Sequence, residues 1–140
     1  EGIEKDTAMQ LEARHMAFVN QLPEHLAVNG NHSLLYSVFR NLTDNAIAYA
    51  GEGTTINLTA EEVGDEWHFS FSDNGVGVAA EHLPRIFERF YRVDKGRSRK
   101  MGGTGLGLAI VKNVVIAHGG TIAAEITTGG GLTIRFRMGN

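Results

Sequence analysis

The chain has 140 residues, of which 42% are hydrophobic and 21% charged, with a formal net charge of −3. These values are typical of one globular domain with its own core, and the slight negative charge gives no reason to expect nucleic acid as a partner. The absence of cysteine excludes disulfides and thiolate metal sites. No apolar run approaches the roughly 20 residues of a membrane span.

The N-terminal half of the chain predicts a helix, a strand and a second, longer helix. Residues 1–14 are polar with helical spacing, and residues 15–20 alternate weakly like a strand. Asn31 is a candidate N-cap for a helix that runs to about Ala50, where Gly51 ends it. The apolar stripe of this helix consists of Leu34, Val38, Leu42 and Ala46.

The remaining segments predict a sheet with further helices. In chain order we expect strands over 54–63 and 66–72, a helix over 81–92, an irregular polar segment over 93–103, a helix over 105–118, and strands over 121–128 and 132–138. The strands alternate apolar and polar residues, so only one face of the sheet is apolar. A sheet with one wet face and helices on the other is an α/β two-layer sandwich.

A polar line runs along the long helix beside its apolar stripe. Asn41, Asn45 and Tyr49 recur at every fourth position, about 60° away from the stripe. Burying an unpartnered amide costs about 1–3 kcal/mol, so two such amides favour a polar partner such as a hydrated cation or a phosphate. The alternative is that both amides face water or bridge to a neighbouring loop.

Two glycine-rich segments suggest a nucleotide. In Asp73-Asn-Gly75-Val-Gly77, a carboxylate at a strand end precedes glycines that let a flat ligand approach, which suits the amino group of adenine. In Gly103-Thr-Gly105-Leu-Gly107, glycines precede a predicted helix, whose first N–H groups bind phosphate. The alternatives are an ordinary turn and a flexible loop.

Two other phosphate-binding motifs are excluded or disfavoured. The chain has no Gly-x-x-x-x-Gly-Lys-Ser/Thr sequence, so a P-loop is excluded. The segment 75–80 imitates a dinucleotide-binding fingerprint, with Asp94 about 20 residues further on. That fold needs a buried strand before Asp94, but residues 85–92 have helical spacing and too much charge.

Four segments in fixed order resemble the motifs of sensor histidine kinases. They are Asn41-Leu-Thr-Asp-Asn45-Ala, Asp73-Asn-Gly75-Val-Gly77, Phe87-Glu-Arg-Phe90-Tyr-Arg92 and Gly103-Thr-Gly105-Leu-Gly107-Leu, which are similar to the N box, first glycine box, F box and second glycine box. The resemblance extends from about residue 20 to residue 138. It implies the Bergerat fold, an α+β sandwich with a mixed, mostly antiparallel five-stranded sheet and helices on one face. It also implies one catalytic domain over 1–140, with 1–14 as a candidate helix or linker from a dimerisation domain.

The resemblance implies ATP and Mg²⁺ as ligands. Asn45 matches a metal ligand, Asn41 a phosphate or water contact, and Asp73 the acceptor for the adenine amino group. Tyr49 matches an aromatic residue beside the base, and Arg92 an arginine that reaches the terminal phosphates. Asn41, Asn45 and Arg92 are thus the expected catalytic residues. Further expected nucleotide contacts are Gly75 and Gly77, the lid cations Lys95, Arg97, Arg99 and Lys100, and the donors Gly103, Thr104, Gly105, Leu106 and Gly107.

The implied function is transfer of the ATP γ-phosphate to a histidine in a two-component system. None of the six histidines has the sequence context of the phosphate-accepting residue, so we expect it on a separate dimerisation domain of the same kinase. A response regulator would follow as the next partner, the isolated domain would be monomeric, and the location would be the cytoplasmic part of a membrane-bound sensor. Ala48 replaces a frequent lysine, which leaves open a regulatory module without transfer. An anti-sigma-type serine kinase is the third alternative.

Overall fold

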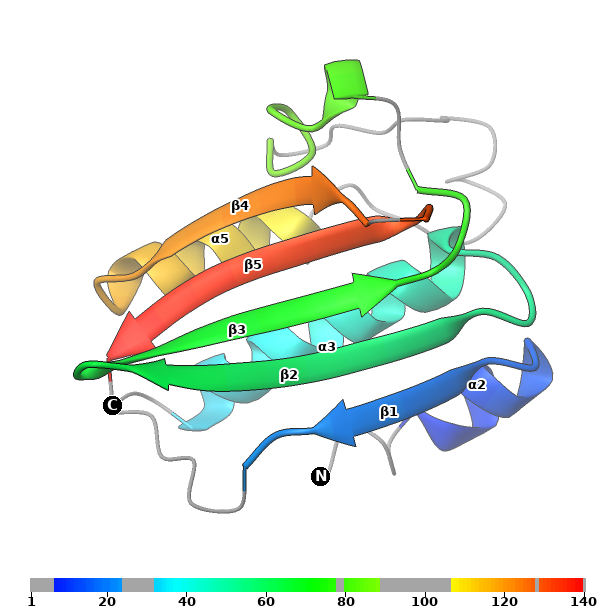
Figure 1. The fold of residues 1–140 in the computed structure, drawn as a ribbon, viewed down its shortest axis with the longest axis horizontal. Helices are drawn as coiled ribbons and strands as arrows, with labels where there is room; N and C mark the ends of the chain where they lie inside the picture. Colours follow the sequence, from blue (N-terminus) through cyan, green and yellow to red (C-terminus); the bar gives the residue numbers. More distant parts are fainter. Residues whose placement is uncertain (1–6, 24–31, 78–79, 89–106, 128, 140) are drawn as a thin grey trace.

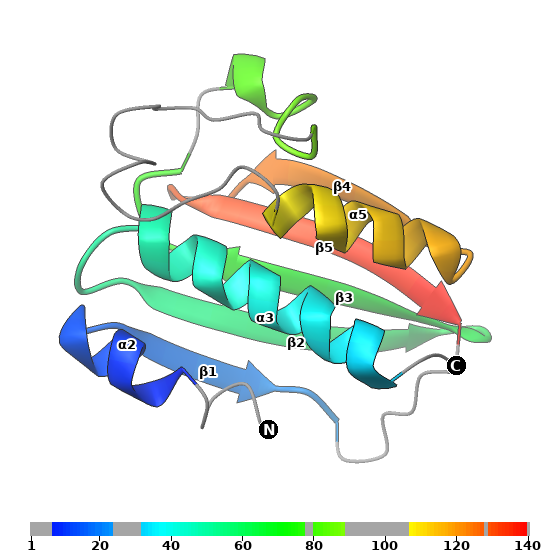
Figure 2. The ribbon, with the colours of Figure 1, turned by 180° about the vertical axis from the view of Figure 1, so that it is seen from behind.

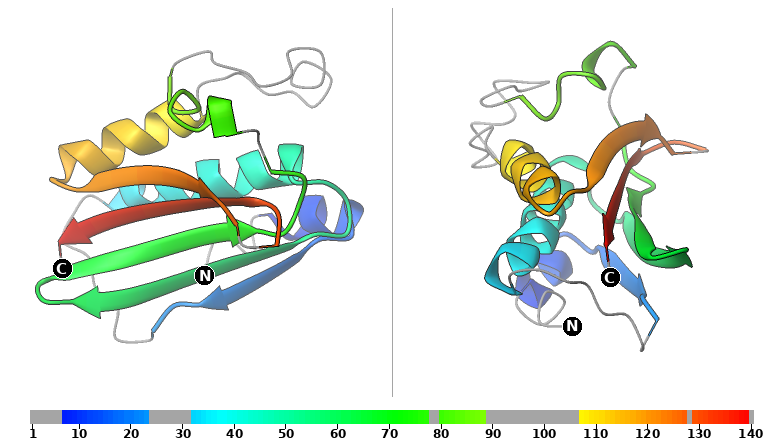
Figure 3. Two further views of the ribbon diagram at one scale, coloured as in Figure 1. Left: turned by 45° about the horizontal axis from the view of Figure 1, so that its top comes forward. Right: turned by 90° about the vertical axis from the view of Figure 1, so that its left-hand side faces the viewer.

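The computed structural model describes residues 7–23, 32–77, 80–88, 107–127 and 129–139. Its helices and strands form two layers (Figure 1). Helices cover one face of a twisted sheet, and the opposite face of the sheet is open, as the right-hand view of Figure 3 shows. The predicted two-layer sandwich is confirmed.

The sheet has five strands in the order β1-β2-β3-β5-β4. β1 and β2 pair in parallel, whereas the other neighbouring strands are antiparallel, so the sheet is mixed and mostly antiparallel as expected. None of the helices in the described ranges is long and apolar enough to cross a membrane. In chain order the elements are α2 (Ala8–Ala13), β1 (Ala17–Gln21), α3 (His32–Tyr49), β2 (Thr55–Val63), β3 (Glu66–Asp73), the 3-10 helix η1 (Ala80–His82), α5 (Gly107–Ala117), β4 (Thr121–Ile126) and β5 (Leu132–Gly139).

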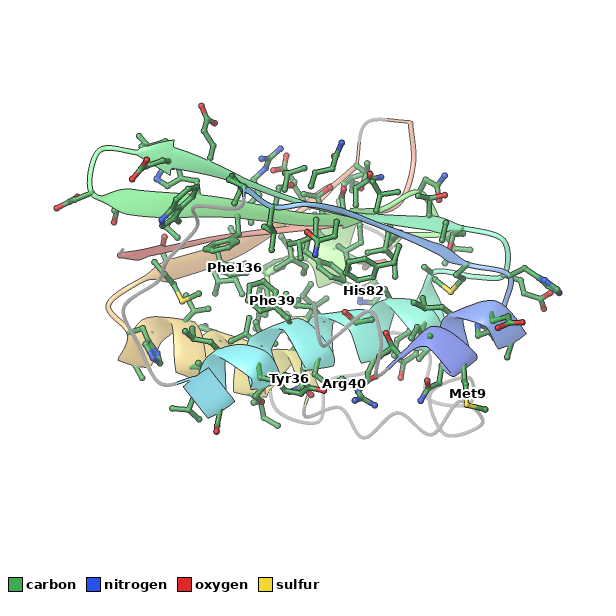
Figure 4. All side chains as sticks on the ribbon, turned by 90° about the horizontal axis from the view of Figure 1, so that it is seen from below. Met9, Tyr36, Phe39, Arg40, His82 and Phe136 are labelled. Atoms are coloured by element: carbon green, nitrogen blue, oxygen red, sulfur yellow. The ribbon has the colours of Figure 1, made fainter. Side chains whose placement is uncertain are left out.

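The core lies between the two layers and is formed by alternate residues of the central strands. Trp67 and Phe69 of β3 and Phe136 of β5 are all almost completely buried. The rings of Phe69 and Phe136 stack with centroids 4.8 Å apart, and Phe39 of α3 packs edge-on against Phe69 at 5.7 Å. Figure 4 shows Phe39 and Phe136 between the helix and the sheet. Large aromatic side chains at alternate positions therefore join the layers, because each buries a large apolar area on one face only.

The apolar stripe predicted for α3 is correct over most of its length. Val38, Leu42 and Ala46 are buried, but Leu34 is 43% exposed. A row of residues at four-residue spacing rotates by about 40° per step around a helix. Leu34 at the start of the row is therefore about 120° away from Ala46, which takes it out of the buried face.

The helix predicted over 81–92 is wrong in its described part. η1 covers only Ala80–His82, and the following backbone bonds, Arg85 N–H to His82 O and Glu88 N–H to Arg85 O, both span three residues rather than four. Pro84 has no N–H to donate and disfavours the helical conformation of the residue before it. Burial of Ile86 holds this segment to the core without a regular helix. Residues 89–92 lie outside the described ranges.

The N-terminal helix predicted over 1–14 is described only as the short α2. α2 ends with His15 in the left-handed conformation at φ 55°, and Met16 N–H donates to Leu11 O at 2.9 Å. This is a Schellman termination, in which the two residues that close the bond also pack together; here both are buried. The candidate N-cap Asn31 lies outside the described ranges.

Candidate nucleotide-binding site

Asp73 is a buried carboxylate at the end of β3. Its side chain is 8% exposed, and its Oδ1 accepts hydrogen bonds from Gly75 N–H at 2.9 Å and Leu132 N–H at 3.3 Å. Oδ2 takes part in neither of these bonds. Burial raises the pKa of Asp73, while the two backbone donors act in the opposite direction. Two backbone N–H groups therefore hold the carboxylate in one orientation through its Oδ1.

The turn after Asp73 lies directly against the C-terminal end of α3. Val76 N–H donates to Ala50 O at 2.9 Å. A Cβ on Gly75 would stand 2.1 Å from the same carbonyl oxygen, so no other residue fits here without a shift of backbone. Gly77 has φ 66°, and a Cβ there would stand 2.9 Å from Gly131 O. Both glycines thus have a packing role in addition to the role expected beside a nucleotide.

The predicted polar line of α3 lies at the margin of the core. Asn41, Asn45 and Tyr49 are all half-buried. The Asn41 Nδ2 donates to Ser37 O at 2.8 Å and to Ser37 Oγ at 3.1 Å, which fixes the amide by bonds within its own helix. The Asn41 Oδ1 is then turned toward α5, since a Cβ on Gly107 would stand 3.3 Å from it. The last glycine of the second glycine-rich segment therefore lies beside the first asparagine of the polar line.

α3 consequently links both glycine-rich segments. Its C-terminal end contacts the turn at Gly75 and Val76 through Ala50, and its middle contacts the first residue of α5 through Asn41. Figure 2 shows the C-terminal end of α3 beside the segment that follows β3. It also shows that α5 begins next to α3. Other predicted site residues lie outside the described ranges: Arg92, Lys95, Arg97, Arg99, Lys100, Gly103, Thr104, Gly105 and Leu106.

The structure adds the β4–β5 turn, which the sequence interpretation did not include. Gly131 has φ 110°, and a Cβ there would stand 2.0 Å from the carbonyl oxygen of Asp73. Leu132 donates its N–H to the same residue. Thr133 of β5 is 5% exposed although it alternates with the buried residues Leu132 and Ile134, and its Oγ1 lies 2.8 Å from Thr127 Oγ1. The run of three glycines over 129–131 was the available signal for a tight approach.

A hollow of about 620 Å³ lies over the central strands, with polar residues of the open sheet face in its lining. Its cations already have partners: Arg135 pairs with Glu125, and Arg137 donates to Thr121 Oγ1 at 2.8 Å. Asp73 alternates with the open-face residues along β3 and therefore points to the helix side. This hollow is thus separate from the site at Asp73.

Comparison with known proteins agrees with this geometry. Residues 30–139 match the family described as histidine kinase-, DNA gyrase B-, and HSP90-like ATPase. The chain is 41% identical over 128 residues to the sensor histidine kinase WalK of Bacillus subtilis (strain 168), an alignment that covers 89% of this chain and 21% of WalK.

Three solved structures of histidine kinases share the fold. The nucleotide-free catalytic domain of histidine kinase ThkA has a TM-score of 0.85 at 25% identity, covering 99% of this chain and 88% of that one. Full-length ShkA in complex with AMPPNP has a TM-score of 0.81 at 26% identity, covering 98% of this chain and 28% of that one. ThkA has also been solved in complex with the response regulator protein TrrA, where the match has 23% identity and a TM-score of 0.80.

The chain therefore belongs to the family of histidine kinase-, DNA gyrase B- and HSP90-like ATPases, as a catalytic domain of the sensor histidine kinase type. The family predicted from the four motifs is confirmed. The chain spans about a fifth of the length of WalK.

Proposed function

We propose that this domain binds ATP with Mg²⁺ along α3 and donates the γ-phosphate to a histidine on a separate dimerisation domain of the same protein. The observation that carries the proposal is the double contact of α3, with the Asp73 turn through Ala50 and with the start of α5 through Asn41. A base held at the first contact would have its phosphates directed toward the second. The AMPPNP in the ShkA complex is consistent with such a ligand.

The base would be recognised by Asp73. Its Oδ2 is free of the two backbone bonds that end on Oδ1, so it is available to accept from the adenine amino group. Guanine carries an oxygen at that edge, and two acceptors would then face each other in a buried site. Tyr49, half-buried on the last turn of α3, would pack beside the base, with Gly75 and Gly77 against its other edge.

The metal would be held by amide oxygen, which suits Mg²⁺. Among the described residues there is no group of three or more histidine and acidic side chains that could hold a metal ion. Amide oxygens are hard ligands of the kind that Mg²⁺ accepts alongside water and phosphate. We assign Asn45 as the direct ligand, and Asn41, held by Ser37, as a contact to phosphate or metal-bound water. When bound, Mg²⁺ neutralises part of the phosphate charge.

The transferred phosphate would lie near the start of α5. Gly107 begins an 11-residue helix, and the N–H groups of a helix start attract phosphate. From the sequence we add the donors Gly103, Thr104, Gly105 and Leu106, and the cations Arg92, Lys95, Arg97, Arg99 and Lys100. A histidine nitrogen of the dimerisation domain attacks the γ-phosphorus in line, the bond to the β–γ bridging oxygen breaks, and ADP leaves. No base is required from this chain.

We also propose a cellular setting for this domain. Residues 1–140 would form one monomeric catalytic domain with no nucleic-acid partner, in the cytoplasmic part of a membrane-bound sensor. α2 belongs with the core of this domain, because Leu11 is buried in it. A response regulator would receive the phosphate from the dimerisation domain, in keeping with the ThkA complex.

Phosphate transfer tests this function directly. We expect the chain, mixed with ATP labelled at the γ-phosphate and the dimerisation domain of the same protein, to produce acid-labile, base-stable phosphohistidine on that domain. Nucleotide binding without transfer would instead support a regulatory module. Acid-stable label would support a serine kinase.

Asn45→Ala is expected to weaken ADP binding about tenfold or more in the presence of Mg²⁺ and by no more than about twofold in a chelator. A side chain that acts through the metal loses its effect once the metal is removed. Calorimetric titration under both conditions measures the two losses. Asn113→Ala is the matched control, since Asn113 is exposed on α5; equal losses in Asn45→Ala with and without metal would contradict the assignment.

A further inference from the structure

Asn74 forms a link between the nucleotide turn and the neighbouring strand. Its Oδ1 accepts a hydrogen bond from Thr55 N–H at 2.7 Å, across 19 residues of chain. Ile56 and Asp73 form the last backbone pair at this end of β2 and β3. The Asn74 side chain therefore supplies, for the next rung of the ladder, the acceptor that a strand carbonyl would otherwise provide.

The segment around Thr55, which donates this hydrogen bond, is itself fixed by backbone hydrogen bonds and strand pairing. Thr55 is the first residue of β2 and pairs with Ala17 of β1. Just before it, Thr54 O accepts from Ala17 N–H at 3.1 Å, and Gly53 N–H donates to Arg14 O at 2.9 Å. The Thr55 N–H that donates to Asn74 thus belongs to a segment fixed by hydrogen bonds to the N-terminal part of the chain.

Several hydrogen bonds hold the turn after Asp73, and side-chain oxygens of Asp73 and Asn74 accept most of them. Asp73 Oδ1 accepts from Gly75 N–H within the turn and from Leu132 N–H of β5, and Val76 N–H donates to the carbonyl oxygen of Ala50, the residue after α3. The Asn74 bond is the tie to β2, and it is made by an exposed side chain. It can therefore be removed by substitution with little change in burial.

We propose that Asn74 is a positioning residue for adenine recognition, which acts through Thr55 N–H to hold the Asp73 carboxylate in the orientation that accepts the adenine amino group. The inference rests on the proposed function, because it assigns Asp73 to the base. Asn74 itself does not touch the nucleotide in this account. Loss of the hydrogen bond between Thr55 N–H and Asn74 Oδ1 lets the turn rotate about Asp73. This rotation lowers selectivity for adenine more than it lowers affinity for the phosphates.

The test compares ADP with inosine diphosphate, which lacks the amino group. Titrations use the unmodified chain, Asn74→Ala, Asn74→Asp and the matched control Asn57→Ala, which removes an amide from β2 opposite Ser72. We expect the unmodified chain to prefer ADP at least about tenfold, a difference of about 1.4 kcal/mol. Asn74→Ala should lower this preference about threefold or more by weakening ADP alone. Asn74→Asp, which keeps an oxygen acceptor, and Asn57→Ala should both retain it.

The ratio of the two affinities separates positioning from other effects. The added charge of Asn74→Asp repels both nucleotides alike and cancels in the ratio. Hydrogen exchange at the Thr55 amide should be faster in Asn74→Ala and slow in Asn74→Asp. An unchanged preference in Asn74→Ala, an equal loss in both Asn74 variants, or a loss shared equally by the two nucleotides would overturn the inference. An unmodified chain without preference for ADP would overturn the adenine role of Asp73 and this inference with it.

Discussion

Asp73→Asn is expected to weaken ADP and ATP binding by roughly 30- to 150-fold, equivalent to about 2–3 kcal/mol, which is the range for a hydrogen bond to a charged group. Asparagine has the same shape and can keep its Oδ1 in the two bonds from Gly75 and Leu132. Its NH₂ group then replaces the oxygen that we propose faces the adenine amino group, so two hydrogen-bond donors oppose each other. Calorimetric titration at pH 7 measures the loss.

The same substitution is expected to stabilise the domain without nucleotide. Burial raises the pKa of Asp73 above the ordinary value of about 3.9. The folded state therefore holds that proton more tightly than the unfolded chain does. Ionised Asp73 lowers the free energy of unfolding at neutral pH, and this cost disappears as the pH falls through the raised pKa toward about 3.9.

Thermal unfolding of the nucleotide-free proteins checks this sign. Asp73→Asn should have the higher midpoint at pH 7, and its advantage should shrink toward pH 4 as Asp73 of the unmodified chain takes up its proton. ADP affinity of the unmodified chain should also fall over the same acidic range, because a protonated carboxyl has lost its free acceptor. A lower midpoint for Asp73→Asn at pH 7 would mean that the ionised carboxylate stabilises the fold.

Gly75→Ala is expected to lower the free energy of unfolding by about 3 kcal/mol, at the upper end of the usual cost of overpacking, and to abolish nucleotide binding. The new Cβ would stand 2.1 Å from Ala50 O and 2.6 Å from Ala50 C. Both atoms are backbone, so the end of α3 or the turn must move. Either movement breaks the bond from Val76 N–H to Ala50 O and displaces Asp73 from α3.

Two other glycines provide matched controls in urea denaturation. Gly139→Ala meets nothing within 4 Å and should change stability by less than about 0.5 kcal/mol. Gly53→Ala also meets nothing within 4 Å but has φ 76°, so it isolates the cost of left-handed backbone, about 1–2 kcal/mol. If the Gly75→Ala variant had the same free energy of unfolding as Gly139→Ala, the stability of the domain would not depend on the close approach of α3 and the turn.

Local periodicity predicted most of the elements. The alternation of Trp67, Phe69 and Phe71 predicted β3, and all three are buried. The four-residue spacing of Asn41, Asn45 and Tyr49 predicted their place at the margin of the α3 core face, where all three are half-buried. Such patterns depend only on the geometry of a single helix or strand, which is why they can be read without knowledge of neighbours. The order of the four motifs added the family, and with it the sheet architecture.

Tertiary structure decided the contacts that shape the candidate site. Leu132 N–H reaches Asp73 across 59 residues, and Asn74 reaches Thr55 across 19. Both bonds depend on β3 lying between β2 and β5, an order that the alternation within each strand does not carry. In the segment after η1, tertiary structure likewise overrode the local pattern: burial of Ile86 and the missing N–H of Pro84 outweighed the helical spacing of its residues. Residue patterns determined which face of each element is apolar, whereas strand order and close backbone packing determined which polar groups meet at Asp73.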